Sequence, residues 1–113
     1  MTEPVDPDAL RRFALTDDEQ VLRDLYQEFL RANAGIALDI AQSIEGQELL
    51  TASRLAHRFK SSAGLIGARP LLELTEQLVA AARSEDQRAT DQRFQDFRRE
   101  LERVLAWVEA RIA

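Results

Sequence analysis

The only histidine and the only lysine of this 113-residue chain lie three positions apart, at His57 and Lys60. Every other basic residue is an arginine. Residues three apart share one face of a helix, so the imidazole and the ammonium are expected to project side by side. Imidazole is a nucleophile near neutral pH, and an ammonium is a compact positive charge that suits an anion attached to that imidazole. This pair is therefore the first candidate for chemistry.

The composition excludes several kinds of site and partner. With no cysteine and one histidine, the chain has no disulfide, no thiolate nucleophile and no zinc site of the usual kind, and no Asp-rich calcium loop is visible. A net charge of −5 argues against nucleic acid and anionic membrane surfaces as partners. Met1-Thr2-Glu3-Pro4 lacks the apolar core of a secretory signal, and no apolar stretch could span a membrane. We expect a cytoplasmic protein with one domain over residues 1–113 and no metal site.

The N-terminal segment predicts a short helix followed by the start of a longer one. Asp6-Pro7 is typical of an N-cap followed by proline at the first helical position. The short helix that begins there is expected to bury Leu10 and Phe13. Residues 16–19, Thr-Asp-Asp-Glu, form a capping box for the next helix.

The middle of the chain continues this helical pattern. Apolar residues repeat at helical spacing to about residue 40, and Asn33 and Gly35 are expected to bend or break that helix. Residues 45–47 predict a turn, and the next helix runs over residues 47–66. Gly67 is the expected glycine just beyond its C-terminus.

Two more helices complete the pattern. One begins at Pro70 and ends at residues 84–86, and the last begins near residues 90–91. The last helix has an apolar stripe of the kind found in helix bundles, formed by Phe94, Phe97, Leu101, Val104, Val108 and Ile112. One short helix and four long ones joined by short loops predict an all-α, antiparallel four-helix bundle.

The helix over 47–66 has distinct core and solvent faces. At about 100° per residue, its core face consists of Ala52, Leu55, Ala56, Phe59, Ala63 and Ile66. His57 lies roughly 140° from the middle of that face and is expected in solvent. The residues expected near it on the solvent side are Ser53, Lys60, Ser61 and Gly64.

Gly64 has an unusual position for a glycine. It lies two turns from His57, inside a helix, where glycine costs about 0.5–1 kcal/mol relative to alanine. Its angle is nearer to solvent than to the core, which favours an open patch of backbone that a ligand or partner approaches. The alternative is tight packing of another helix against Gly64.

His57 and Lys60 also have simpler interpretations. A lone histidine on a protein surface is usually just solvated. A surface lysine is usually solvated as well, or it forms an ion pair with an acid one helical turn away. Positions 56 and 64, four residues from Lys60, hold Ala and Gly instead. A Ser-His-Asp hydrolase using Ser61 is disfavoured because the chain has no nucleophile elbow and no Gly-rich oxyanion loop.

Residues 57–68, His-Arg-Phe-Lys-Ser-Ser-Ala-Gly-Leu-Ile-Gly-Ala, resemble the signature of histidine-containing phosphotransfer (HPt) domains of bacterial phosphorelays. The family pattern has the histidine, an apolar residue two positions later, the lysine, and glycines at the positions of Gly64 and Gly67. Ser61 stands where a glycine is usual. Val79 stands where many members have Glu, and Gln77 is the candidate for a polar contact to the imidazole instead.

This resemblance implies a phosphoryl carrier rather than an autonomous enzyme. His57 would accept a phosphoryl group from a receiver-domain aspartyl-phosphate or a kinase and pass it to another receiver, and Lys60 would offset its charge. The chain would need no cofactor, because the receiver brings the Mg²⁺. Leu50, Leu65 and Ala68 would form a modest apolar docking surface. The alternative is that these leucines pack under neighbouring loops.

Two further hypotheses stay open. The same face could bind and restrain a signalling partner without any transfer of phosphate. The chain could also be a structural bundle without a site, in which case His57 would behave as a free imidazole and tolerate any substitution.

Overall fold

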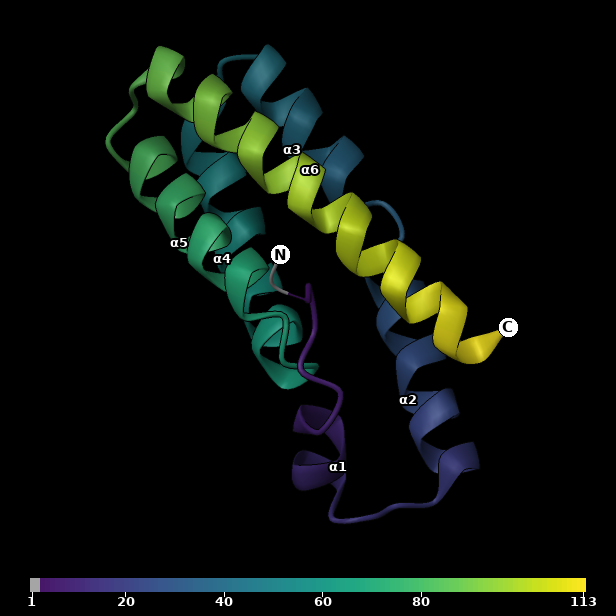
Figure 1. Ribbon diagram of the computed structural model, residues 1–113. Helices are drawn as coiled ribbons and strands as arrows, with labels where there is room; N and C mark the ends of the chain where they lie inside the picture. The colour runs from purple at the N-terminus through teal and green to yellow at the C-terminus, as the bar shows by residue number, and fades with distance from the viewer. Residues whose placement is uncertain (1–2) are drawn as a thin grey trace.

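In a computed structural model that describes residues 3–113, the chain forms an elongated helical bundle (Figure 1). The described residues contain no strand and form the helices α1 (Ala9–Ala14), α2 (Glu19–Ala32), α3 (Ile36–Glu45), α4 (Leu49–Leu65), α5 (Arg69–Arg83) and α6 (Gln87–Ile112). The predicted four-helix bundle is confirmed, with α2 and α3 together as its first member. The absence of a secretory signal was predicted partly from Met1 and Thr2, which lie outside the described residues.

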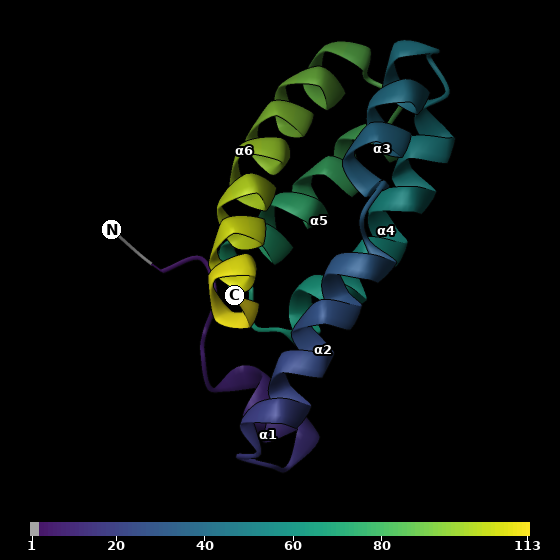
Figure 2. The same cartoon turned by 90° about the vertical axis from the view of Figure 1, so that its right-hand side faces the viewer.

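The predicted break after α2 is also confirmed. The side-chain amide of Asn33 donates to the carbonyl oxygen of Phe29 at 2.9 Å, and Gly35 is the N-cap of α3. Helices α2 and α3 therefore follow one another along the same side of the bundle (Figure 2). Helix α2 packs against α6, and α3 packs against α4 and α6.

Two predictions for the N-terminal helix were wrong. Helix α1 begins later than predicted, after Asp8, because the Asp6 carboxylate accepts a hydrogen bond from the Asp8 backbone and the Asp6 N–H donates to the carbonyl of Gly67, both at 2.9 Å. These bonds hold residues 6–8 in a turn. The helix that follows is short and buries Leu10, whereas Phe13 points outward and is 62% exposed.

The N-cap of α2 also differs from the prediction. Asp18, and not Thr16, caps this helix, because its Oδ1 accepts from the backbone N–H groups of Gln20 and Val21 at 2.9 and 3.3 Å. Thr16 accepts a bond from the Asp18 N–H instead, at 3.1 Å. The polar sequence before the helix therefore held two candidate caps, Thr16 and Asp18, and Asp18 sets the start of the helix.

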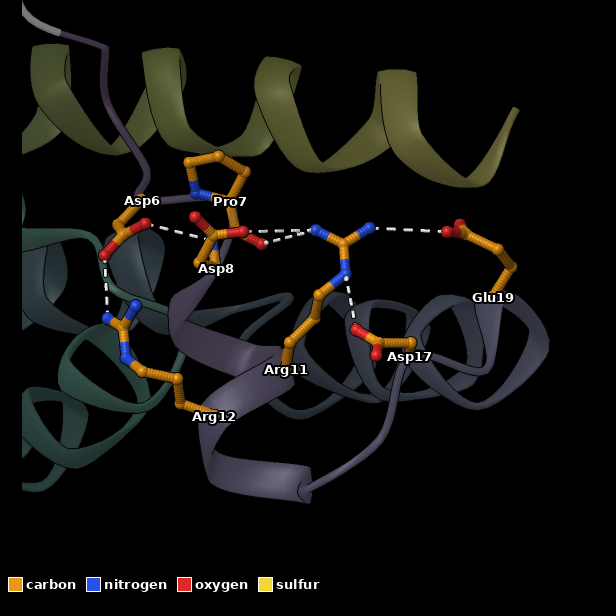
Figure 3. Close-up of polar contacts among 7 residues, drawn as sticks. All are labelled: Asp6, Pro7, Asp8, Arg11, Arg12, Asp17 and Glu19. Carbon is orange, nitrogen blue, oxygen red and sulfur yellow. Dashed lines mark hydrogen bonds and ion pairs between the residues drawn. The ribbon is translucent and has the colours of Figure 1, made fainter.

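Two arginines of α1 tie the N-terminal segment together (Figure 3). Arg12 donates to the Asp6 carboxylate at 2.8 Å. Arg11 lies 3.7 Å from a carboxylate oxygen of Asp17 and 3.3 Å from one of Glu19, at the start of α2. Exposed ion pairs of this kind each contribute little to stability. The buried side chains of the N-terminal segment therefore contribute most to its attachment to the bundle.

Helix α6 begins earlier than the predicted residues 90–91. The Asp86 carboxylate accepts from the Ala89 N–H at 3.0 Å, and this cap starts the helix at Gln87. The predicted apolar stripe of α6 is buried apart from its last member, Ile112, which is partly buried.

The turn between α4 and α5 places both helices for the site. Gly67 has a φ of +77°, its N–H donates to the Gly64 carbonyl, and the N–H of Ala68 donates to the Ala63 carbonyl. This is the hydrogen-bond pattern of a Schellman motif, which ends α4 as predicted. A Cβ at Gly67 would overlap the Cβ of Ala9, so α1 sits directly on this turn. Helix α5 then runs back along α4.

Candidate functional site

His57 lies on the exposed side of α4, as predicted. Five members of the predicted core face are buried and the sixth, Leu55, is partly buried. The Phe59 ring meets the rings of Phe97 and Phe29 with centroid distances of 5.6 and 6.4 Å, and this packing fixes the rotation of α4. His57 therefore points outward, and it forms no hydrogen bond or ion pair with any described residue. Its two ring nitrogens are available to an incoming group.

Lys60 is partly exposed and has a partner that the sequence did not reveal. Its Nζ lies 3.8 Å from a carboxylate oxygen of Glu76 on α5. Helix periodicity relates Lys60 only to acids on its own helix, whereas the antiparallel return of α5 along α4 brings Glu76 close to it. The lysine charge thus lies between α4 and α5 in a weak, solvent-exposed pair.

Ser61 and Gly64 are exposed on α4, as predicted. A Cβ placed on Gly64 would meet only Leu72 Cδ2, at 4.0 Å, which is ordinary van der Waals contact. No neighbouring helix packs tightly on this glycine, so the alternative that it serves close helix packing is wrong. The backbone here is open to a partner.

Ser53 was predicted on the solvent side and is instead buried, with 6% of its surface exposed. Its hydroxyl donates to the carbonyl oxygen of Val79 on α5 at 3.3 Å. The side of α4 that bears Ser53 is covered by α5, which the rotation of a single helix cannot show. Ser53 therefore joins two helices and does not belong to the exposed face.

The three apolar residues predicted to form a docking surface divide into two groups. Leu50 and Leu65 are exposed, at 47% and 38%, so the alternative that they pack under neighbouring loops is wrong. Ala68 is fully buried. It follows Gly67, whose left-handed backbone turns the chain inward, and it forms the N-cap of α5. Ala68 is therefore a core residue.

Gln77 is exposed on α5 and forms no hydrogen bond with His57 or any other described residue. The predicted polar contact to the imidazole is absent from the described part of the chain.

A groove beside His57 contains residues that the sequence analysis missed. Its volume is about 510 Å³, and it is lined by Leu50, Thr51, Ser53, Arg54, Leu55, His57, Arg58 and Arg83. The basic character of this groove was visible in the sequence, since residues 49–65 contain arginines but no aspartate or glutamate.

The described residues meet neither the requirements of a metal site nor those of a membrane-spanning helix. They include no group of three or more His, Cys, Asp or Glu side chains that could hold a metal ion. No helix among them is long and apolar enough to cross a membrane.

One protein family matches this chain. The sequence profile of the Hpt domain matches residues 24–107, which cover α3, α4 and α5 and most of α2 and α6. His57, Lys60 and Gly64 lie within the match, and α1 lies outside it. No curated protein and no solved structure matches the chain.

Proposed function

The chain belongs to the Hpt domain family, whose members are histidine phosphotransfer modules of phosphorelays, and we propose that His57 is its phosphoryl acceptor. Members of this family interact with receiver domains and kinases. In the proposed reaction, His57 takes the phosphoryl group from a receiver aspartyl-phosphate, or from a kinase, and passes it to another receiver. The observation that carries the proposal is the exposure of the chain's only histidine on the helix at the centre of the family match.

The proposed transfer needs little from this chain beyond an accessible nitrogen. The lone pair of one imidazole nitrogen attacks phosphorus in line, the N–P bond forms and the bond from phosphorus to the aspartyl oxygen breaks. The electron pair of that bond leaves with the aspartate carboxylate. In the second transfer, a carboxylate oxygen of the next receiver attacks phosphorus, and the electron pair of the N–P bond returns to the imidazole.

Lys60 is proposed to offset the phosphoryl charge on His57. Lys60 lies one helical turn from His57 on α4, and at 32% exposure its charge would act with partial screening by water. We propose that this chain brings no metal to the reaction and that Mg²⁺ is held by the acids of the receiver.

The proposed docking surface surrounds His57 on α4. Leu50 and Leu65 offer exposed apolar area on either side of it, while Ser61 and Gly64 keep the backbone accessible. A surface of this modest size suits a weak, transient complex, which a carrier between two proteins requires.

The test is a label-transfer assay with radiolabelled phospho-receivers. A phosphohistidine label is acid-labile and base-stable, and its loss in His57→Gln assigns it to the chain's only histidine. We expect His57→Gln to take up no such label while keeping wild-type helicity and thermal stability, since the side chain is exposed. Lys60→Ala is expected to slow the transfer about tenfold or more without unfolding the bundle.

Equal labelling of wild type and His57→Gln would refute the proposal. Equal binding of a receiver to wild type and His57→Ala, with no label ever appearing on the wild type, would favour an interaction module that works without phosphate transfer.

A further inference from the structure

The groove beside His57 combines an apolar floor with a strongly basic rim. Leu50 and Leu55 supply its apolar part, and Arg54, Arg58 and Arg83 supply its charge. No acidic residue lines it. The groove extends along the first half of α4 and reaches the C-terminal end of α5, where Arg83 lies.

The three arginines of this groove have no acid to neutralise them. None of them forms an ion pair with a described residue, and the only hydrogen bond among them runs from Arg54 to Thr51, at 3.2 Å. By contrast, Arg11, Arg31 and Arg98 elsewhere on the surface pair with neighbouring carboxylates. The groove is therefore a local concentration of free positive charge.

This concentration runs against the charge of the whole chain. The net charge is −5, yet α4 contains no acid and carries Arg54, Arg58 and Lys60 around His57. A basic cleft in an acidic molecule attracts a compact acidic surface, whereas an extended polyanion is repelled by the surrounding charge. The exposed Leu50 suits the apolar part of a protein surface.

We propose that this groove is the docking site for receiver domains with an acidic rim around their phosphorylated aspartate, and that Arg54, Arg58 and Arg83 select such receivers. This inference rests on the proposed function of His57. The apolar part of the receiver covers Leu50, and its acidic side chains pair with the guanidinium groups. Outside the groove, Ser61, Gly64 and Leu65 are themselves uncharged and make no such selection.

Unpaired rim charges act mainly on the rate of encounter, which they change by factors of about 10–1,000 in electrostatically steered pairs. The arginines are therefore expected to change the second-order rate constant of transfer, which includes the encounter, more than the rate of the transfer step within the complex. It is also expected to weaken as salt shortens the range of the interaction.

The test compares the triple variant R54Q/R58Q/R83Q with wild type and with R93Q. Arg93 is exposed on α6, does not line the groove, and forms no ion pair with a described residue. The probes are two radiolabelled phospho-receivers, one with an acidic and one with a neutral rim. Each transfer rate is divided by the rate at which phosphoramidate, a small phosphodonor that needs no docking, labels His57 in the same variant.

We expect the triple variant to accept phosphate from the acidic receiver about 10–100 times more slowly than wild type at about 50 mM salt, and R93Q to match wild type. The difference should shrink at about 500 mM salt and be absent for the neutral receiver. Equal transfer by the triple variant and wild type, with His57 labelled in both, would overturn the docking inference alone. Labelling of His57 by phosphoramidate but by no receiver would overturn the proposed function and this inference with it.

Discussion

The ammonium of Lys60 on α4 lies 3.8 Å from the carboxylate of Glu76 on α5. Both side chains are partly exposed, so the pair is worth only about 0.2–1 kcal/mol. A phosphoryl group on His57 carries more negative charge than a single carboxylate and would compete for the same ammonium. Under the proposed function, Glu76 would therefore restrain Lys60 before transfer and oppose its interaction with the phosphoryl group afterwards.

Glu76→Gln is expected to shift the equilibrium of phosphoryl transfer toward His57, by up to about fivefold, because Lys60 no longer has a competing carboxylate. The measurement is the ratio of phosphorylated chain to phosphorylated receiver at equilibrium. Glu73→Gln is the matched control, since Glu73 is exposed on the same helix and forms no ion pair with a described residue. A shift toward the receiver in Glu76→Gln would show that the carboxylate positions Lys60 productively instead of competing with the phosphoryl group.

The outward face of α4 could be predicted from the sequence because it depends on helix periodicity alone. Once Phe59 and the alanines beside it were recognised as one core stripe, the exposure of His57, Ser61 and Gly64 followed from the helical angle. The break at Asn33 and Gly35 and the turn at Gly67 were equally local, because these residues favour helix ends through their own backbone preferences.

The contacts of the site with α5 could not be predicted in this way. Ser53 is buried and Lys60 is paired because Val79 and Glu76 approach from another helix, and that register depends on the packing of the whole bundle. Ala68 is buried because of the turn that it follows. The errors of the sequence analysis thus lie at the edges of the α4 face, where a neighbouring element determines exposure.

Gly67→Ala is expected to destabilise the chain by about 1–3 kcal/mol. The backbone there has a φ of +77°, and the added methyl group would overlap the Cβ of Ala9 and displace α1 from the turn. Urea unfolding followed by circular dichroism measures the change. Gly35→Ala is the control, because its Cβ would meet only an Asp39 carboxylate oxygen, at 3.8 Å. Equal stability of the two variants would show that α1 does not depend on this contact.

The attachment of α1 is expected to weaken in acid through Asp6. The hydrogen bond from Arg12, followed by the one from the Asp8 backbone, lowers the pKa of the Asp6 carboxyl below its usual value of 3.8. Because the pKa of Asp6 is lower in the folded chain than in the unfolded chain, its carboxylate stabilises the fold fully at a pH above the unfolded-state pKa. That stabilisation is lost as the pH falls through the folded-state pKa.

Hydrogen exchange of the α1 amides, measured in wild type and Asp6→Asn, tests this dependence. Wild type should be better protected at neutral pH, and the two should converge as the pH falls well below 3.8, where the wild-type carboxyl is also uncharged. A difference that persists unchanged in acid would mean that the charge of Asp6 plays no part.

Gly64→Ala is expected to separate stability from function. The added Cβ meets only Leu72 Cδ2, at 4.0 Å, so the alanine should stabilise α4 by about 0.5–1 kcal/mol through its helix propensity. The same methyl group stands on the open backbone two turns from His57 and should hold a docked receiver away, slowing transfer by about tenfold or more. Urea unfolding and label transfer from a phospho-receiver measure the two effects, with Gly35→Ala as the control for an alanine outside this face. If Gly64→Ala is both more stable and as fast as wild type, close approach to this glycine is not part of docking.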